Sequence, residues 1–251
     1  MRTIVFGDAH GCLDELDDLT YAVRYRQGVD RLVSLGDLMD RGPHPAKCVE
    51  LARKYGAEIV QSNHDEKHLW YRRHFARKAA DPSYKGEPPQ LGPKDIKENE
   101  ALTEADLAWL TAAPDILRAG PHDDVVAVHA GLLPGLAPEA QPHGVCIRLR
   151  WVTETNQQAA AKRDDDGHIV QPPGSEPWAT RYDGMHHVVY GHAVWGLEES
   201  RVDRYGEFFR WGIDTGCCYG GHLTALVLET DEPPRFVRVK ATRSYAERYG
   251  A

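Results

Sequence analysis

The chain has 251 residues, of which 41% are hydrophobic, and its formal net charge is −8. This length and hydrophobic content suffice for a sizeable core, and we expect residues 1–251 to form a single domain. The acidic balance argues against general nucleic-acid binding, and no segment approaches the roughly 20 apolar residues of a membrane span. The five cysteines form no disulfide framework, and the first residues read as a strand rather than a signal peptide. We therefore expect a cytoplasmic protein.

The first third of the chain alternates between strand and helix patterns. Residues 12–27 show apolar side chains at helical spacing, and a second helical pattern ends at Gly56. Strands that alternate with helices predict parallel pairing, with the helices outside the sheet. The predicted elements are strand 3–8, helix 12–27, strand 31–37, helix 45–56 and strand 57–63.

Two polar insertions interrupt the later part of the chain, at about 66–120 and 153–180. The first contains a predicted helix over 102–117 with Thr103 as its N-cap. It also carries a basic cluster at 72–78, which would either meet extra phosphates of a substrate or form a solvated helix face. The second insertion, rich in acids and prolines, is predicted to be a flap. The predicted later strands are 124–131, 186–192, 209–216, 223–229 and 235–241.

Polar side chains follow the predicted strands at the points where they end. The segments concerned read "VFGDAHG", "VSLGDLMDRG", "IVQSNHD", "VAVHAG" and "VVYGH". Ligands of open α/β sheets bind beyond the carboxyl ends of the strands. We therefore expect one site at this edge, built from Asp8, His10, Asp37, Asn63, His129 and His192.

Aspartate, histidine and asparagine together suit manganese, iron, zinc, cobalt or nickel. Asp8 and His10 are two residues apart and could reach one ion, and Asp37 could supply one oxygen to each of two ions. The second ion would be completed by Asn63, His129 and His192. Two such ions clamp a phosphoryl oxygen and activate a water molecule, so we predict two divalent transition-metal ions, with Mn²⁺ as first choice.

The charged residues that follow Asp37 suggest roles beside the metal. Arg41 carries a planar fork of donors that suits phosphate oxygens. Asp40 is left over as a carboxylate near the site, and its expected role is to orient His64. A histidine held by a carboxylate can protonate a leaving oxygen.

The five segments match, in order, the blocks of the calcineurin-like metallophosphoesterases, which the chain resembles from about residue 4 to residue 225. "GDLMDRG" points to the branch of phosphoprotein phosphatases and diadenosine tetraphosphate hydrolases, and "IDTGCCYGGHLTAL" resembles bacterial members. The resemblance implies an α/β fold, a two-sheet β-sandwich flanked by helices, with the site at one end.

The resemblance also implies further site residues and shows two departures. Arg148 resembles a second phosphate-binding arginine of the family; Arg150 is the competitor, because strand alternation would put both on one face. Tyr219 is expected either to close over the substrate or to pack a turn. The third block usually reads Gly-Asn-His-Glu but is "SNHD" here, and "AV" follows "YGH" where the family often has Thr-Pro.

We predict a metal-dependent phosphoester hydrolase that uses metal-activated water. Our first interpretation is a phosphomonoesterase resembling protein serine/threonine phosphatases. The alternatives are a bis(5'-nucleosyl)-tetraphosphatase and a phosphatase of nucleic-acid ends. The expected partner is a phosphorylated substrate, namely a phosphoprotein, a nucleotide or a nucleic-acid end, and no membrane. An inactive scaffold is disfavoured by the intact ligand set.

Overall fold

The first of two large sheets has six strands, with β1 at its centre. The computed structural model describes residues 2–165 and 169–246. Strand β1 pairs in parallel with β2 and antiparallel with β14. The order is β13 (Asp214–Thr215), β14 (His222–Glu229), β1 (Arg2–Phe6), β2 (Arg31–Ser34) and β3 (Glu58–Ile59), and β15 (Arg235–Lys240) also pairs with β14.

The second large sheet has five strands and mixed pairing. Strand β10 lies between β12 and β5 and is parallel to both, whereas the two outer strands run antiparallel to their neighbours. The order is β11 (Arg201–Tyr205), β12 (Phe208–Gly212), β10 (His187–Tyr190), β5 (Val125–Val128) and β4 (Ile116–Ala119).

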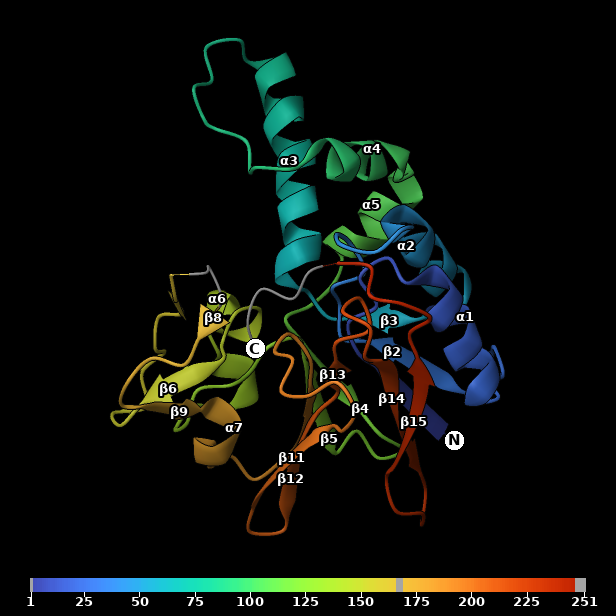
Figure 1. The fold of residues 1–251 in the computed structure, drawn as a ribbon, viewed down its shortest axis with the longest axis vertical. Coiled ribbons are helices and arrows are strands. Elements are labelled where there is room, and N and C mark those ends of the chain that lie inside the picture. Colours follow the sequence, from blue (N-terminus) through green and yellow to red (C-terminus); the bar gives the residue numbers. More distant parts are fainter. Residues whose placement is uncertain (1, 166–168, 247–251) are drawn as a thin grey trace.

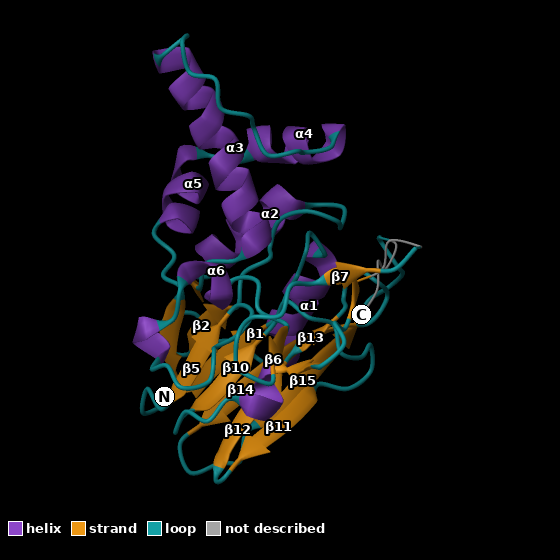
Figure 2. Cartoon of the chain, turned by 90° about the vertical axis from the view of Figure 1, so that its left-hand side faces the viewer, coloured by secondary structure: helices purple, strands orange, loops and turns teal. Residues whose placement is uncertain are grey.

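The two sheets pack face to face, because their strands alternate side chains between two apolar surfaces. Val5 of β1 and Val189 of β10 belong to one buried cluster, which lies between the sheets. Their neighbours Ile4 and Phe6 belong instead to the cluster that α1 and α2 cover, and Val188 to the cluster under α6 and α7. The expected two-sheet β-sandwich flanked by helices is therefore confirmed (Figure 2).

Three helices cover the first sheet: α1 (Leu13–Ala22), α2 (Pro45–Lys54) and α5 (Glu104–Thr111). Short helices α6 (His143–Cys146) and α7 (Trp178–Arg181) pack on the second, and a 3-10 turn spans Pro138–Ala140. The long helix α3 (Asn63–Ala80) starts near the sheets and projects away from them, with α4 (Pro93–Ala101) beside it (Figure 1). Helices α4 and α5 and most of α3 belong to the first polar insertion.

Several element boundaries differ from the sequence prediction. The helix predicted over 102–117 ends at Thr111, and β4 begins at Ile116, because Pro114 disfavours helical backbone before it. Its N-terminus is as predicted, since Thr103 and Asp106 form a reciprocal capping box. The first predicted helix stops at Ala22, and Arg24 takes a φ of +52° that a helix cannot contain.

The second polar insertion contains short paired strands. Strands β6 (Trp151–Thr153) and β9 (Ser175–Pro177) pair antiparallel, as do β7 (Lys162–Arg163) and β8 (Ile169–Val170). Part of the predicted flap, residues 166–168, lies outside the described residues. Among the described helices, none has the length and apolar character needed to cross a bilayer.

Candidate active site

The strand ends bring the six predicted ligand residues together at one edge of the sandwich. The loop after β1 carries Asp8 and His10, the loop after β2 carries Asp37, and Asn63 begins α3 after the short loop that follows β3. The other two follow β5 and β10, whose ends are adjacent because these strands pair in register. His129 lies between Asn63 and His192, with its Nε2 atom 3.0 Å from Asn63 Oδ1 and 3.2 Å from His192 Nδ1.

The loops that present these residues have unusual backbone conformations. Five non-glycine residues have left-handed φ values, which cost energy and concentrate at functional sites. A Cβ atom on Gly42 would lie 2.2 Å from the carbonyl oxygen of His10, so the loops after β1 and β2 touch through their backbones. The five residues are His10 (+44°), Asp37 (+50°), Asp40 (+68°), Arg41 (+67°) and His192 (+66°).

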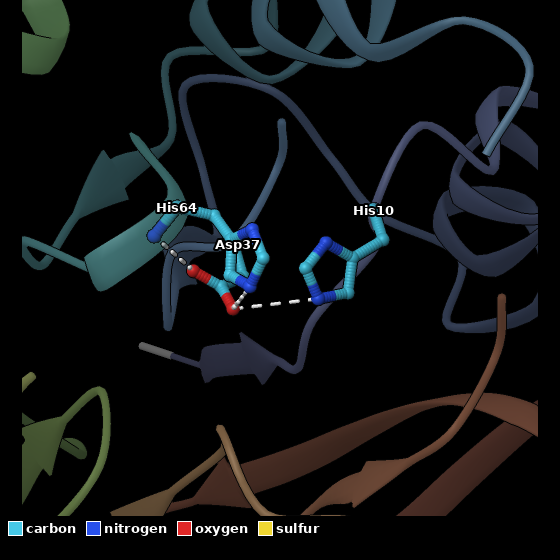
Figure 3. Close-up of side chains that lie close together, drawn as sticks. All are labelled: His10, Asp37 and His64. Atoms are coloured by element: carbon cyan, nitrogen blue, oxygen red, sulfur yellow. Dashed lines mark hydrogen bonds and ion pairs between the residues drawn. The ribbon is translucent and has the colours of Figure 1, made fainter. Parts of the chain in front are cut away.

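Asp37 lies at the centre of the cluster, with its two carboxylate oxygens facing different histidines. Oδ2 is 3.3 Å from His10 Nε2 and 4.0 Å from His64 Nε2 (Figure 3). Oδ1 is 3.5 Å from His129 Nε2 and accepts a hydrogen bond from the backbone N–H of His64 at 3.1 Å. Two sets of side chains could therefore hold an ion each: His10, Asp37 and His64 form one, and Asp37, His129 and His192 the other.

The donor atoms around Asp37 fit metal ligation. His10 Nδ1 lies 2.8 Å from the carbonyl oxygen of Met39, and His129 Nδ1 lies 2.7 Å from that of Leu35. Each carbonyl can only accept, so each Nδ1 carries the proton and each Nε2 keeps its lone pair. Within the described residues, His10 Nε2 and Asp8 Oδ1 are buried without a hydrogen-bond partner. Such orphaned atoms are what a divalent cation would satisfy.

A third buried carboxylate, Asp214, adds to the negative charge of the site. Burial raises the pKa of Asp8 well above its usual value, and repulsion from Asp214 and Asp37 raises it further. Burial alone would also raise the pKa of Asp37, but His129 and His64 outweigh it and hold that pKa low. Asp214 was not among the predicted ligands, because it lies within the predicted strand 209–216, and within β13 of the structure, rather than after a strand as Asp8 and Asp37 do. Three clustered carboxylates favour bound cations.

His64 and Asp40 form the predicted pair. His64 Nδ1 lies 2.5 Å from Asp40 Oδ2, and burial lowers the pKa of His64 to about 4. Asp40 has two more partners, which the sequence analysis missed: Lys67 Nζ at 2.5 Å and His68 Nε2 at 2.6 Å. Both stand one turn of α3 after His64. That helical spacing could have predicted that they share the face of His64 and reach Asp40.

Arg41 contacts the side chain of His64. Its Nη2 atom is 3.2 Å from His64 Nε2, and its guanidinium lies 5.2 Å from the centre of the Tyr219 ring. Tyr219 is therefore at the site, beside the arginine predicted to bind phosphate. An arginine only donates, so His64 Nε2 accepts here and the imidazole proton is on Nδ1, facing Asp40.

The structure favours Arg150 over Arg148 as the second arginine of the site. Arg150 is half-buried, its Nη1 lies 3.4 Å from the carbonyl oxygen of His192, and it interacts electrostatically with Asp214 and Asp37. Arg148 is 48% exposed and pairs with Glu66 at 2.9 Å. The strand alternation that we expected to align the two is wrong, since both precede β6: Arg148 lies in the turn after α6, and Arg150 in the irregular segment that follows it.

Comparisons with known proteins identify the family. Residues 1–196 match the family model of the calcineurin-like phosphoesterases. A symmetrical bis(5'-nucleosyl)-tetraphosphatase of Vibrio campbellii is 33% identical, over 90% of this chain and 95% of that protein. The asymmetrical bis(5'-nucleosyl)-tetraphosphatase PrpE of Halalkalibacterium halodurans is 30% identical, over 90% of this chain and 89% of that protein.

Solved structures share the fold. A crystal structure named "putative diadenosine tetraphosphatase" superposes with a TM-score of 0.68 at 29% identity, covering 94% of this chain and 93% of that one. A protein serine/threonine phosphatase of Saccharomyces cerevisiae superposes with a TM-score of 0.54 at 12% identity, covering 97% of this chain and 81% of that one. The second likeness concerns the fold alone.

Proposed function

The chain belongs to the calcineurin-like phosphoesterase family, and we propose that within this family it is a bis(5'-nucleosyl)-tetraphosphatase. It is a phosphoester hydrolase, and the family uses divalent metal ions. The observation that carries the substrate class is the similarity, over about nine-tenths of both chains, to tetraphosphatases of two kinds. This similarity supports our alternative interpretation better than a phosphomonoesterase, because both of these relatives are named as tetraphosphatases.

We propose that two ions bind around Asp37. Asp8 and His10 would hold the first, Asn63, His129 and His192 the second, and Asp37 would share its two oxygens between them. Bound there, the ions would supply Lewis-acid activation of water and neutralise phosphoryl charge. The ligand set suits Mn²⁺ but also iron, zinc, cobalt and nickel. The chain's own contribution is to hold these ligands in one orientation, chiefly through the carbonyl oxygens that fix His10 and His129.

Arg41 and Arg150 are the proposed phosphate-binding residues. Both guanidiniums interact electrostatically with Asp37 and Asp214. Arginine's planar fork matches phosphate oxygens in pairs, which fixes the orientation of the phosphoryl group. Arg148 is not part of this proposal, because Glu66 already holds its guanidinium outside the cluster. Tyr219 would support Arg41 through contact of its ring with the guanidinium.

His64 is the proposed proton donor to the leaving oxygen. Asp40 fixes Nδ1, so Nε2 is the atom that faces the reaction. Nε2 now accepts from Arg41. A bound phosphate would draw that guanidinium away, and Nε2 would then take up a proton from solvent and pass it to the leaving oxygen. A histidine in this role typically contributes about 10²–10⁴-fold to the rate.

The basic cluster at 72–78 gives little support to contact with extra phosphates. Arg72 is occupied, since its Nη2 donates to the backbone carbonyl oxygens of Asn99 and Leu102. Arg77 lies over the ring of Tyr84. Arg77 also follows Asn63 by fourteen residues of one helix, which at about 1.5 Å per residue is roughly 21 Å. The additional phosphates of a polyphosphate substrate would therefore contact residues outside this basic cluster.

The test compares substrates with purified protein that has been stripped by a chelator and reloaded with Mn²⁺. The panel holds diadenosine tetraphosphate, p-nitrophenyl phosphate, a phosphoserine peptide and a 5'-phosphorylated oligonucleotide. We expect the highest kcat/KM for the tetraphosphate and recovery of activity only on reloading. Ion-exchange analysis of products separates symmetrical cleavage to ADP from asymmetrical cleavage to ATP and AMP. A higher kcat/KM for a monoester or the oligonucleotide would contradict the proposal.

A further inference from the structure

Helix α4 contacts the turn that carries Asp40 and Arg41. Lys94, in the first turn of α4, places its Nζ 2.8 Å from the carbonyl oxygen of Arg41 and 2.5 Å from that of Gly42. Glu98 accepts from the backbone N–H of Ala46, in the first turn of α2, at 3.1 Å. A helix of the polar insertion thus contacts this active-site turn and also the start of the helix that follows the turn.

The turn needs such support because its backbone is strained. Asp40 and Arg41 both have φ near +67°, in the left-handed region that β-carbons disfavour. Residues in such conformations persist only where surrounding contacts over-determine them. The ammonium of Lys94 joins two successive carbonyl oxygens of the turn, which fixes its peptide planes.

A second connection runs from α4 to Asp40 through side chains. Asn99 and His68 are both 0% exposed. Asn99 Nδ2 lies 3.1 Å from His68 Nδ1 and 3.1 Å from the backbone carbonyl oxygen of His68. The second contact fixes the amide orientation, because a flipped amide would place its oxygen against that carbonyl oxygen.

This amide determines where the proton of His68 lies. The Asn99 nitrogen can only donate, so His68 Nδ1 accepts and His68 Nε2 carries the proton. His68 Nε2 therefore donates to Asp40 Oδ1, at 2.6 Å. The other oxygen, Oδ2, is left to His64 Nδ1 and Lys67 Nζ. Because His64 and His68 are four residues apart on α3, they hold the carboxylate from one helix face.

We propose that His68 and Asn99 are positioning residues for the reaction, through which α4 orients the Asp40–His64 pair. The donor order is Asn99 to His68, His68 to Asp40, and His64 to Asp40. With one oxygen fixed by His68, the carboxylate cannot rotate away from His64. This inference rests on the proposed function of His64 as the proton donor.

The experiment measures kcat and KM on an alkyl phosphate and on p-nitrophenyl phosphate, whose leaving group needs little protonation. His68→Leu removes the donor to Asp40, whereas His68→Gln can still offer an amide N–H. We expect His68→Leu to lose about 10–10²-fold in kcat on the alkyl phosphate, part of the roughly 10²–10⁴-fold of acid catalysis. The loss on p-nitrophenyl phosphate should be smaller, with KM and bound metal unchanged, and His68→Gln should recover most of the rate.

The matched control is His74→Leu, another buried histidine of α3, whose ring packs against Phe75 and Tyr84. It should keep wild-type kinetics. If His68→Leu does not fold, Asn99→Ala tests the same connection and should show the same dependence on leaving group.

Two outcomes would overturn the inference and can be told apart by His64→Ala, measured in parallel. If His64→Ala loses more on the alkyl phosphate but the His68 and Asn99 variants lose equally on both substrates, only the positioning role fails. If His64→Ala itself shows no dependence on leaving group, the proposed proton donor fails, and the inference with it.

Discussion

Gly191 is the position where one added methyl group should separate function from folding. It directly precedes His192, and a Cβ atom built on it would lie 2.0 Å from Asp8 Oδ1 and 3.1 Å from Asp8 Cγ. Contacts below 3.0 Å do not occur for real Cβ atoms. The Asp8 carboxylate would therefore have to move in a Gly191→Ala variant. The atom displaced is the unpartnered oxygen that we propose as a metal ligand.

The size of the effect follows from this distance. Oδ1 must retreat by about 1 Å, and a misplacement of this size in an active site can cost roughly 10²-fold in rate. The added methyl group would meet the end of a side chain rather than backbone, so the fold can adapt with little loss of stability. When the carboxylate moves, the first contact to be lost should be the hydrogen bond from the His192 backbone N–H to Asp8 Oδ2, at 2.9 Å. We expect about a 10²-fold drop in kcat/KM and a nearly unchanged melting temperature.

The assay combines metal analysis of the dialysed protein with kcat/KM on diadenosine tetraphosphate and p-nitrophenyl phosphate, and thermal melting. Gly144→Ala is the matched control, because nothing lies within 4 Å of its added Cβ and it stands inside helix α6. It should be neutral or slightly stabilising. A folded Gly191→Ala protein with wild-type metal content and rate would refute Asp8 Oδ1 as a ligand.

Three further predictions concern charged groups. Asp37→Asn should weaken both ions and abolish most activity; two tightly bound ions in the folded variant, with a near wild-type rate, would contradict a shared ligand. Arg150→Ala should reduce kcat/KM by about 10–10²-fold, the worth of a hydrogen bond to a charged group. Arg148→Ala should change kcat/KM by no more than about twofold. A larger loss in Arg148→Ala than in Arg150→Ala would make Arg148 the second phosphate-binding arginine. Although burial acts to raise it, the pKa of Asp30 is lowered by hydrogen bonds from two arginines. Because its folded pKa lies below the unfolded value near 3.9, its contribution to stability is present above that pH and lost as pH falls below it. Asp30→Asn should thus cost about 1–3 kcal/mol at pH 7 and less near pH 3, measured by denaturant unfolding; an equal cost at both would argue against the ionised form.

The sequence by itself determined which residues could make a site and roughly where they would meet. Polar residues such as Asp8, Asp37 and His129 follow apolar runs, and neighbouring parallel strands must end at the same edge of a sheet. That pattern is local, so it can be read without knowing how the sheets pack. The β-sandwich itself came from family resemblance, because apolar runs do not reveal which sheet a strand joins.

Only the tertiary structure shows that Arg150, and not Arg148, lies beside the candidate site, which is why we propose Arg150. Both stand in the irregular segment between α6 and β6, where no periodicity predicts side-chain direction, and burial beside Asp214 distinguishes Arg150. The same holds for the partners of Asp40. His68 has the helical spacing to face His64, but its proton position depends on Asn99, which is 31 residues further along the chain. Contacts of that kind depend on how α4 packs against α3, and packing is a property of the folded chain rather than of any stretch of its sequence.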